Sequence, residues 1–501
     1  MDYALLINRY AEQHKQHGWP RQRLLHECLR AAIRDGTLAA GTRLVASRAL
    51  AEELGIARNS VLYAYEQLAS EGYVAGDRRG TVVAALAPDR QPQPAGAGGQ
   101  QPGLSQRARD LREVGGPANM QGAFVPGVPA LDHFPLALWR RMLERALRSL
   151  SIEQLNYADP AGEPPLRAAI ADHLRASRGV VCGAEQVFIT DGTQSSLDVC
   201  MRALADQGDT LWIEHPGYGG ALASARWAGL RIAAIGVDED GIAPRADDWL
   251  LQPPRLIYTT PSHQYPTGGV LSLRRRLALI EAARGAGALI IEDDYDSEFR
   301  HDGPPLPAMQ GLQPDAPVVY LGTFSKTMFP SLRIGFLVVP PALAQPLSQM
   351  RAQSSARGRV AEQLALAEFL QSGQFALHLR RMRRLYRQRR DALVAALDEH
   401  LGTAAEVHGG SAGMHLALRF HDQQLDDAAI SARLRELGIV AHALSRHGVQ
   451  AGSGWRGLML GYAQIPAEEM DGLVRQLASV IHLAAYQAGR KRLTGGRAST
   501  P

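Results

Sequence analysis

The stretch GTFSKTMFPSLR, residues 322–333, contains Lys326, one of only three lysines in a chain of 501 residues. The others, Lys15 and Lys491, lie near the two ends, so every other basic side chain between them is Arg or His. Arg stays protonated at ordinary pH, whereas a desolvated Lys amine can lose its proton and attack a carbonyl. Lys326 is therefore the only residue of the main domain able to form a Schiff base, unless it is simply a leftover surface lysine.

The sequence around this stretch alternates short apolar runs with amphipathic segments. The strand candidates are QVFIT (186–190), TLWIE (210–214), RLIYTT (255–260), ALIIED (288–293), VVYLG (318–322) and IGFLVV (334–339). Helical patterns such as 273–287 lie between them. Such alternation predicts a mostly parallel sheet with helices on both faces. A long amphipathic helix over 375–400 is predicted to lead into a smaller α/β subdomain.

Three motifs that could bind a ligand begin at the ends of three of these strands and continue into the segments that follow. ITDGTQSSLDV (189–199) predicts a strand that turns at Gly192 into a helix, whose free N–H groups could hold a phosphate. EHPGYGGA (214–221) places Tyr218 on a glycine-rich loop, where it could stack on an aromatic ring. TTPSHQYPTGG (259–269) is a turn-rich loop at a strand's carboxyl end, where α/β sheets bind ligands.

Two further motifs supply charge. IIEDDYDSEF (290–299) places carboxylates directly after a buried strand. Asp293 there could pair with a protonated ring nitrogen, although such a carboxylate is more often a helix cap or a metal ligand, and Tyr295 could hydrogen-bond a phenolate oxygen. In the opening stretch, two hydroxyls precede Lys326, and Arg333 follows with a guanidinium suited to bidentate phosphate binding.

A phosphate cradle, a stacking tyrosine, an acidic partner, an amine and a phosphate-binding arginine are what pyridoxal 5′-phosphate requires. In this order the motifs resemble those of fold-type I aminotransferases. The resemblance implies that Lys326 forms the internal aldimine, that Asp293 keeps the pyridine nitrogen protonated, and that Tyr295 contacts the ring hydroxyl while Tyr218 stacks on the ring. It also implies a phosphate site made of Thr193, Gln194, Thr323, Ser325 and Arg333.

The N-terminal segment has a different pattern. Residues 21–35 predict a helix, and a short helix over 48–54 is followed by a turn at Gly55 and a second helix over 57–70. Two short strands then flank GDRRG. This order predicts a winged helix-turn-helix. Its second helix opens with the polar residues Arg58, Asn59 and Ser60, which would enter a major groove, and its wing carries Arg78 and Arg79, which would contact phosphate or the minor groove.

This segment resembles the GntR family of bacterial transcription factors, including the stretch Ser47-Arg48 followed by Leu50-Ala51. Ser47 and Arg48 are therefore also expected at the DNA. Val45 and Ala46 stand where Pro-Ser is usual, and the wing is one residue short. A GntR-like winged helix joined to an aminotransferase-like domain is the arrangement of the MocR subfamily. That resemblance implies a head-to-tail homodimer and a small-molecule effector: pyridoxal phosphate itself, an amine or an amino acid.

The predicted architecture is multidomain. We expect a winged helix-turn-helix over 1–86, a flexible Pro/Gly-rich linker over 87–119, a fold-type I α/β domain with a small C-terminal α/β subdomain over 120–490, and a disordered tail over 491–501. Three scattered cysteines fit a reducing compartment. The sequence contains no metal motif and no apolar run long enough to span a membrane, so we expect a cytoplasmic protein without a metal site.

Near the C-terminus the sequence departs from the aminotransferase pattern. The position expected to hold a carboxylate-binding Arg has Trp455, and its neighbour Arg456 either binds an effector carboxylate or is solvated. Tyr265 stands where Asn is usual. Two functions remain open: a regulator that senses pyridoxal phosphate or an amino compound, or an active aminotransferase with an accessory DNA-binding module. The regulator is favoured, and catalytic turnover is left undecided.

Overall fold

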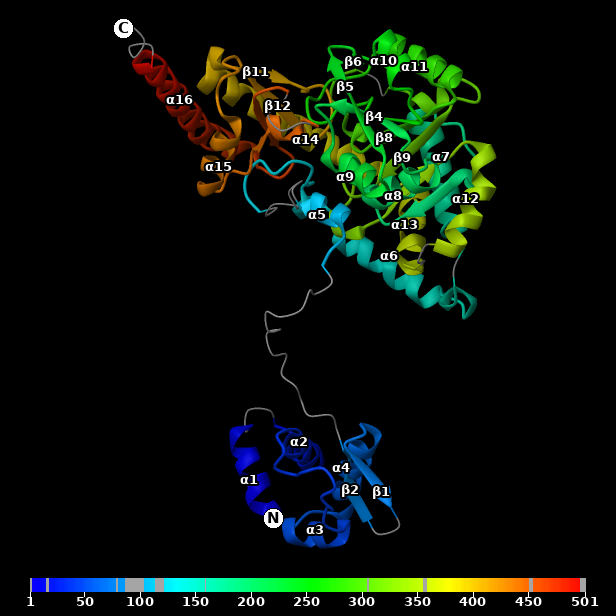
Figure 1. Ribbon diagram of the computed structural model, residues 1–501, viewed down its shortest axis with the longest axis vertical. Coiled ribbons are helices and arrows are strands. Elements are labelled where there is room, and N and C mark those ends of the chain that lie inside the picture. The colour runs from blue at the N-terminus through cyan, green and yellow to red at the C-terminus, as the bar shows by residue number, and fades with distance from the viewer. Residues whose placement is uncertain are drawn as a thin grey trace. The chain divides into compact units, whose positions relative to one another are not determined.

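The computed structural model describes residues 2–14, 18–77, 80–85, 103–112, 121–157, 159–303, 306–354, 358–449 and 454–495 (Figure 1). The chain divides into two compact units, Met1–Gly103 and Leu104–Pro501. Each unit has its own buried apolar cluster and is described separately.

The N-terminal unit is a winged helix-turn-helix, as predicted. Its elements are α1 (Tyr3–Gln13), α2 (Arg21–Arg34), α3 (Ser47–Leu54), α4 (Arg58–Ser70), β1 (Val74–Asp77) and β2 (Gly80–Val83). Gly55 ends α3 with a φ of 60°, a left-handed conformation that glycine adopts without strain. The buried side chains of Leu29, Leu50, Val61 and Leu68 hold the helices together. The helix α1 was not predicted, and the wing residues Arg78 and Arg79 lie outside the described residues.

The large unit contains an eight-stranded sheet in the order β3-β10-β9-β8-β7-β4-β5-β6. These strands are β3 (Val187–Thr190), β4 (Thr210–His215), β5 (Arg231–Asp238), β6 (Gly241–Ile242), β7 (Leu256–Thr259), β8 (Leu289–Asp294), β9 (Val318–Thr323) and β10 (Gly335–Val338). The pairs from β5 through β4, β7 and β8 to β9 are parallel. β10 runs antiparallel to both β9 and β3, and β6 is antiparallel to β5. The prediction of a mostly parallel sheet is confirmed.

Helices cover both faces of this sheet (Figure 1). Successive residues of β8 show why: Ile290 belongs to the apolar cluster of Leu279 in α11 (Leu273–Ala286), whereas Ile291 belongs to the cluster of Leu197 in α8 (Thr193–Ala203). Because side chains alternate across a strand, a strand buried on both sides is apolar throughout. After α5 (Gln106–Arg112), the α-helices of this unit before α14 are α6 (Leu136–Ser149), α7 (Pro164–Arg178), α8 (Thr193–Ala203), α9 (Gly219–Ala228), α10 (Ala246–Leu251), α11 (Leu273–Ala286), α12 (Pro341–Ser354) and α13 (Val360–Gln371).

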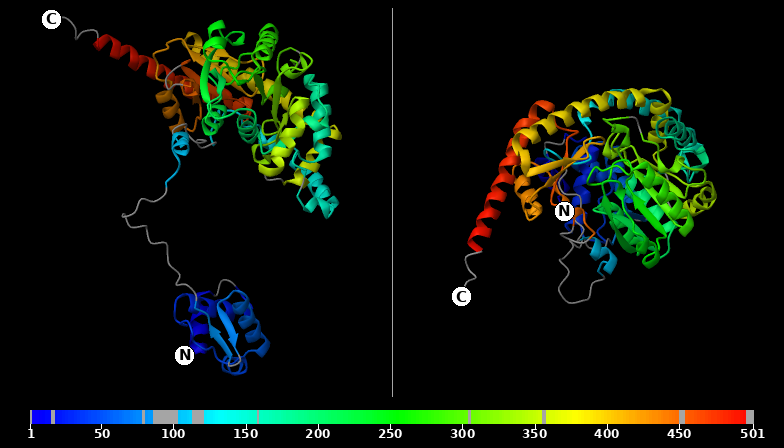
Figure 2. Two further views of the ribbon diagram at one scale, coloured as in Figure 1. Left: turned by 45° about the vertical axis from the view of Figure 1, so that its right-hand side comes forward. Right: turned by 90° about the horizontal axis from the view of Figure 1, so that it is seen from above.

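The long helix α14 (Gln374–Leu401) leads into the small C-terminal subdomain. Its antiparallel sheet has the order β11-β12-β14-β13. The elements are β11 (Ala405–His408), β12 (His415–Phe420), α15 (Asp427–Glu436), β13 (His442–Ala443), β14 (Gly457–Gly461) and α16 (Met470–Gly495). Figure 2 shows α16, in red, extending beyond the rest of this subdomain. No helix in the described part of the chain is long and apolar enough to cross a membrane.

The described residues of the predicted linker, 103–112, include a helix. Helix α5 (Gln106–Arg112) packs against α9, and Arg107 Nη1 donates a hydrogen bond to the Trp227 carbonyl. The Ser105 hydroxyl, which accepts from the Ala108 N–H, stabilises the start of this helix. The structure therefore departs from a linker that is unstructured along its whole length. Most of the remaining predicted linker lies outside the described residues. Helix α16 (Met470–Gly495) includes the first residues of the predicted disordered tail, 491–501, so these are helical, and the rest of the tail lies outside the described residues.

Candidate functional site

Lys326 lies just beyond β9, at the carboxyl end of the parallel strands. Its Nζ donates a 2.7 Å hydrogen bond to the carbonyl of Gly127. A Cβ at Gly127 would come within 2.7 Å of the same Nζ, so this approach requires glycine. Burial lowers the pKa of the Lys326 amine, while the nearby carboxylates of Asp296 and Asp293 raise it. The amine is thus more easily deprotonated, and so more nucleophilic, than an exposed lysine.

Asp293 is the last but one residue of β8, beside the strand that leads to Lys326. Its Oδ2 accepts a 2.7 Å hydrogen bond from Tyr258 Oη, whereas its Oδ1 is buried and has no partner among the described residues. Burial raises the pKa of this carboxyl to about 7, and the Tyr258 hydrogen bond opposes the shift. A buried acceptor without a donor is costly. A protonated ring nitrogen at Oδ1 would satisfy it and return the carboxyl to its charged form.

Gly192 and Arg333, from two of the motifs predicted to bind a phosphate, meet at the N-terminus of α8. Gly192, with a φ of 94°, precedes the helix, and a Cβ there would lie 3.4 Å from the Arg333 Cζ. The Arg333 guanidinium therefore lies beside the free N–H groups of the first helical turn, where an anion is favoured. In the described part of the chain this guanidinium has no hydrogen-bond or ion-pair partner.

The remaining residues predicted to bind a phosphate differ in whether their side chains already form hydrogen bonds within the protein. Thr323 ends β9, and its Oγ1 accepts a 3.2 Å hydrogen bond from the Ser325 N–H, in the loop that carries Lys326. Thr193 opens α8. Gln194 follows it, but its side-chain amide donates to the Gly220 carbonyl and to Ser224 Oγ. Only the backbone N–H of Gln194 remains for an anion in this arrangement.

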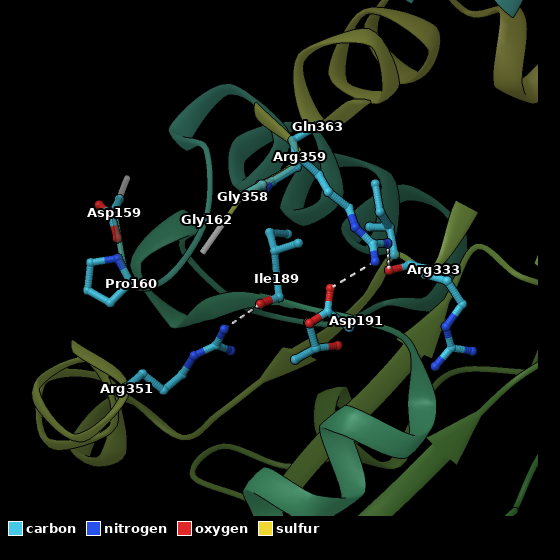
Figure 3. A pocket seen from close by; sticks show the side chains of 12 residues that line it. Asp159, Pro160, Gly162, Ile189, Asp191, Arg333, Arg351, Gly358, Arg359 and Gln363 are labelled. Atoms are coloured by element: carbon cyan, nitrogen blue, oxygen red, sulfur yellow. Dashed lines mark hydrogen bonds and ion pairs between the residues drawn. The ribbon is translucent and has the colours of Figure 1, made fainter. Parts of the chain in front are cut away.

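A pocket opens on the side of Arg333 (Figure 3). Two more arginines line it and are held in place: Arg359 lies 3.5 Å from Asp191 Oδ1, and Arg351 donates to the Ile189 carbonyl. Arg359 also donates to the carbonyl of Arg333, whose φ of 52° is left-handed. These contacts fix the backbone turn that presents the Arg333 side chain.

The predicted aromatic residues lie around the same site. Tyr218, on the loop before α9, packs edge-on against Tyr265 with ring centroids 5.4 Å apart. Burial raises the pKa of Tyr218 to about 12, and the charges of Asp293 and Arg333 also act on it. Tyr295 Oη donates to the His263 carbonyl. Tyr265, which replaces the usual Asn, is thus an edge-on partner of Tyr218.

Four polar residues near this site were not predicted from the sequence: His263, Asp296, His415 and His447. His263 Nδ1 lies 3.1 Å from Asp296 Oδ2, and His415 packs on His263 with ring centroids 4.6 Å apart. His447 packs edge-on against Tyr265 at 5.2 Å. His263 and Asp296 are inside two motifs already singled out, whereas no sequence signal marked His415 or His447. The donor atoms of His263, Asp296 and His415 also lie within 4.8 Å of one another, close enough to hold a metal ion.

Arg456 does not join this group. Its Nη1 pairs with Asp427 Oδ1 at 3.3 Å, and Asp427, at the start of α15, is fully buried. The Arg456 N–H donates to Gln423. The contacts of Arg456 are therefore with the small subdomain's own α15 and its preceding loop, and they argue against its predicted role as a carboxylate anchor.

Five of the residues predicted to contact DNA are described, and they lie together on the N-terminal unit: Ser47, Arg48, Arg58, Asn59 and Ser60. Arg58 and Asn59 are exposed at the start of α4, next to the half-buried Ser60. The Arg58 Nε lies 3.4 Å from Ser47 Oγ, so α3 and α4 meet at this point, and Arg48 is exposed beside it. This arrangement leaves the polar end of α4 open to a groove.

Each of the two units matches a known protein family. Residues 131–477 match the family model of aminotransferase class I and II, and residues 22–83 match that of bacterial regulatory proteins of the gntR family. The probable rhizopine catabolism regulatory protein MocR of Rhizobium meliloti is 41% identical over 94% of this chain and 95% of its own length. The pyridoxine biosynthesis regulator PdxR of Corynebacterium glutamicum is 32% identical over 92% and 95%.

Solved structures similar to this chain are aminotransferases. The α-aminoadipate aminotransferase LysN of Thermus thermophilus, solved with N-(5′-phosphopyridoxyl)-L-leucine, has a TM-score of 0.67 at 28% identity, over 76% of this chain and 96% of its own. The multiple substrate aminotransferase of Thermococcus profundus has the same TM-score at 24% identity, over 77% and 96%, and supports the fold alone. The large domain thus has the fold-type I architecture.

Proposed function

Because the chain belongs to the MocR subfamily of GntR-family transcriptional regulators, we propose that Lys326 binds pyridoxal phosphate in its large domain and that its winged helix binds operator DNA. Membership in this subfamily makes the protein a pyridoxal-phosphate-dependent regulator of transcription.

The main support for pyridoxal phosphate is the buried Oδ1 of Asp293, which has no hydrogen-bond partner among the described residues. The other oxygen of this carboxyl accepts the 2.7 Å hydrogen bond from Tyr258, so Oδ1 is left as a single buried acceptor. The amine of Lys326, the α8 N-terminus with Arg333 and the Tyr218 ring supply the other groups that the cofactor needs. The residues present therefore fit pyridoxal phosphate. When bound, this cofactor supplies an aldehyde that captures primary amines reversibly.

The chain's own residues have separate tasks in this site. Lys326 would hold the aldehyde covalently, and burial lowers the pKa of its amine so that it loses a proton more easily. Asp293 Oδ1 would accept a hydrogen bond from the ring nitrogen, and Tyr295 would contact the ring hydroxyl. The first turn of α8 and Arg333 would neutralise the phosphate. Tyr218 would cover the ring.

An active aminotransferase remains the second candidate, since the same groups would serve turnover. The Arg456–Asp427 ion pair weakens it for amino acid substrates, because the one arginine predicted to hold a substrate carboxylate is already engaged. The relatives named as regulators cover both units of this chain, whereas LysN covers only the large one. Sensing is therefore the better supported role.

Resemblance to the subfamily also supports a head-to-tail homodimer and a location in the cytoplasm with the chromosome. The effector is proposed to be pyridoxal phosphate or an amino compound that reaches the same site.

The test uses the full-length protein loaded with pyridoxal phosphate. Binding to the DNA upstream of its own gene is measured with and without a panel of amines and amino acids, and multiple-turnover transamination is measured with the same panel. We expect an effector to change DNA affinity without sustained turnover. Sustained turnover with DNA affinity unaffected by every compound would favour the aminotransferase.

A further inference from the structure

Helix α14 presents a row of arginines to solvent. The helix contains seven arginines between positions 380 and 390. Four of them, Arg380, Arg381, Arg384 and Arg387, are exposed. Because their spacing follows the helical period of 3.6 residues, the four side chains lie on one face of α14, along about 10 Å of its axis. These four residues form the arginine face of α14.

No carboxylate neutralises the arginine face within the described part of the chain. None of its four guanidinium groups forms an ion pair with a described Asp or Glu. Arg387 donates to the carbonyl of His301, which carries no charge. The side chains of Asp302 and Asp391 do reach α14, but both pair with Arg390. The arginine face therefore keeps its four positive charges for an external anion.

The stability of α14 itself does not explain this arrangement. Neighbours within the arginine face are three or four residues apart, so their like charges repel across the helix surface. The acidic residues of α14 are all C-terminal to these arginines, at Asp391, Asp398 and Glu399. This order is the reverse of what the helix dipole favours. An anion bound across the arginine face would relieve the repulsion.

The arginine face fits a polyanion whose charges are closely and regularly spaced. Guanidinium groups bind phosphate oxygens through paired hydrogen bonds. B-DNA carries one charge per about 1.7 Å of its axis, so a stretch as long as the arginine face presents about six phosphates. The chain has such a polyanion at hand, because it belongs to a family of DNA-binding regulators. DNA held by the winged helix is kept at a high local concentration for the rest of the same chain.

We propose that the arginine face of α14 binds the phosphate backbone of DNA that flanks the operator, without reading its sequence. This inference rests on the proposed function, because the winged helix must hold the operator. It gives the large unit a second role besides ligand binding. That role adds affinity that depends on the length of the DNA and on the salt concentration.

The test measures the DNA affinity of the full-length protein, loaded with pyridoxal phosphate, by fluorescence anisotropy at several salt concentrations. Two duplexes from the region upstream of its own gene are compared. The short duplex is trimmed to the base pairs whose replacement abolishes binding. The long duplex extends this segment by about two helical turns, or about 20 base pairs, on each side.

Two triple variants that lose the same charge are compared on these duplexes. The test variant carries Arg380→Gln, Arg381→Gln and Arg384→Gln, which remove the charge and keep side chains that favour a helix. The control variant carries Arg140→Gln, Arg175→Gln and Arg475→Gln. These three control arginines are exposed on three other helices, and each pairs with a carboxylate.

The expected difference lies in the salt dependence. Each phosphate contact contributes about 0.9 to the slope of log Kd against log salt concentration. On the long duplex the test variant should therefore lower this slope by about 2–3 and weaken binding about tenfold or more at low salt. On the short duplex it should match the control variant. The control variant should keep the wild-type slope on both.

Equal slopes for the test and control variants on the long duplex would overturn the proposal. A dimer that dissociates only in the test variant, seen by analytical ultracentrifugation, would also overturn it, because the arginine face would then contact a second copy of the chain. Cofactor absorbance shows whether the test variant is folded. If it is not, the single variants Arg381→Gln and Arg384→Gln replace it, each expected to lower the slope by about 1.

The two proposals fail in different ways. If the wild-type protein does not bind this DNA, or if Arg58→Ala leaves its affinity unchanged, the proposed operator binding fails. If Arg58→Ala weakens binding and the test variant keeps the slope of the control variant, only the assignment of the arginine face fails.

Discussion

Tyr258 Oη donates a 2.7 Å hydrogen bond to Asp293 Oδ2 and leaves Oδ1 as the only unpartnered oxygen of this buried carboxyl. The two residues sit on adjacent parallel strands, with Tyr258 opposite Ile291 in the register. The hydrogen bond lowers the pKa of the carboxyl against the larger effect of burial. Tyr258 therefore orients the carboxylate and keeps it available for a cationic partner.

Replacing Tyr258 with Phe should weaken cofactor binding about tenfold, because a hydrogen bond to a charged group contributes about 1.5–3 kcal/mol and part of that loss also affects the free protein. The dissociation constant for pyridoxal phosphate, measured by absorbance titration at pH 7.5, checks this. Tyr320→Phe is the control, since its hydroxyl donates to Asp294 rather than Asp293. Equal effects in both variants would contradict a specific role for Tyr258.

Because the pKa of Asp293 is raised, we expect the stability of the cofactor-free protein to depend on pH. Its folded-state pKa, about 7, lies above the usual value of 3.8. Between these values the folded state binds a proton that the unfolded state has lost, so this group makes unfolding easier as pH rises. Asp293→Asn removes the effect. Its free energy of unfolding relative to wild type should increase between pH 4 and pH 7, by at most about 1.4 kcal/mol per pH unit, and then level off.

The same variant should bind pyridoxal phosphate more weakly than wild type, because an amide cannot neutralise a protonated ring nitrogen. Urea unfolding of the cofactor-free proteins at several pH values gives the first quantity, and cofactor titration gives the second. A stability difference that does not change with pH would show that Asp293 is not the titrating group.

Gly127→Ala tests the placement of the Lys326 amine. The new Cβ would lie 2.7 Å from Nζ, so the amine must move, and cofactor uptake should slow or weaken about tenfold or more. Gly208→Ala is a matched control, because Gly208 also has a left-handed φ, of 91° against 72°, but nothing within 4 Å of the added Cβ. Both variants carry the backbone strain and only one displaces the amine. Equal uptake by the two would refute the contact.

Arg58→Ala should weaken binding to operator DNA about tenfold and leave cofactor occupancy unchanged, because Arg58 lies at the open end of α4. Arg9→Ala is the control, an exposed arginine of the same unit on α1. Fluorescence anisotropy with labelled DNA measures both. If Arg9→Ala had the larger effect, α1 rather than α4 would face the DNA.

Much of the fold could be predicted because local patterns and global structure agree. The strands of the large domain are continuous apolar runs, and Gly192 and Gly55 mark turns that only left-handed backbone can make. The antiparallel β10 could not be predicted, since an apolar strand shows no direction. Helix α5 was missed because a Pro/Gly-rich composition dominates the segment around a short run of helix-forming residues.

The residues of the candidate site could likewise be predicted only in part. Lys326, Asp293 and Arg333 could be found because the sequence places them at strand ends in a fixed order. His415 and His447 could not, because they come from the small subdomain and reach the site only through the packing of two sheets. The ion pair between Arg456 and Asp427 could not be predicted either, because it is a tertiary contact between residues 29 apart in sequence.

The most direct test of the central claim is to reduce the pyridoxal-phosphate-loaded protein with borohydride and locate the modified residue by mass spectrometry. The account predicts a single phosphopyridoxyl group on Lys326, retained when Lys15 and Lys491 are replaced by Ala and absent in Lys326→Ala. A modified Lys15 or Lys491 in place of Lys326, or no modification of the wild-type chain, would contradict it.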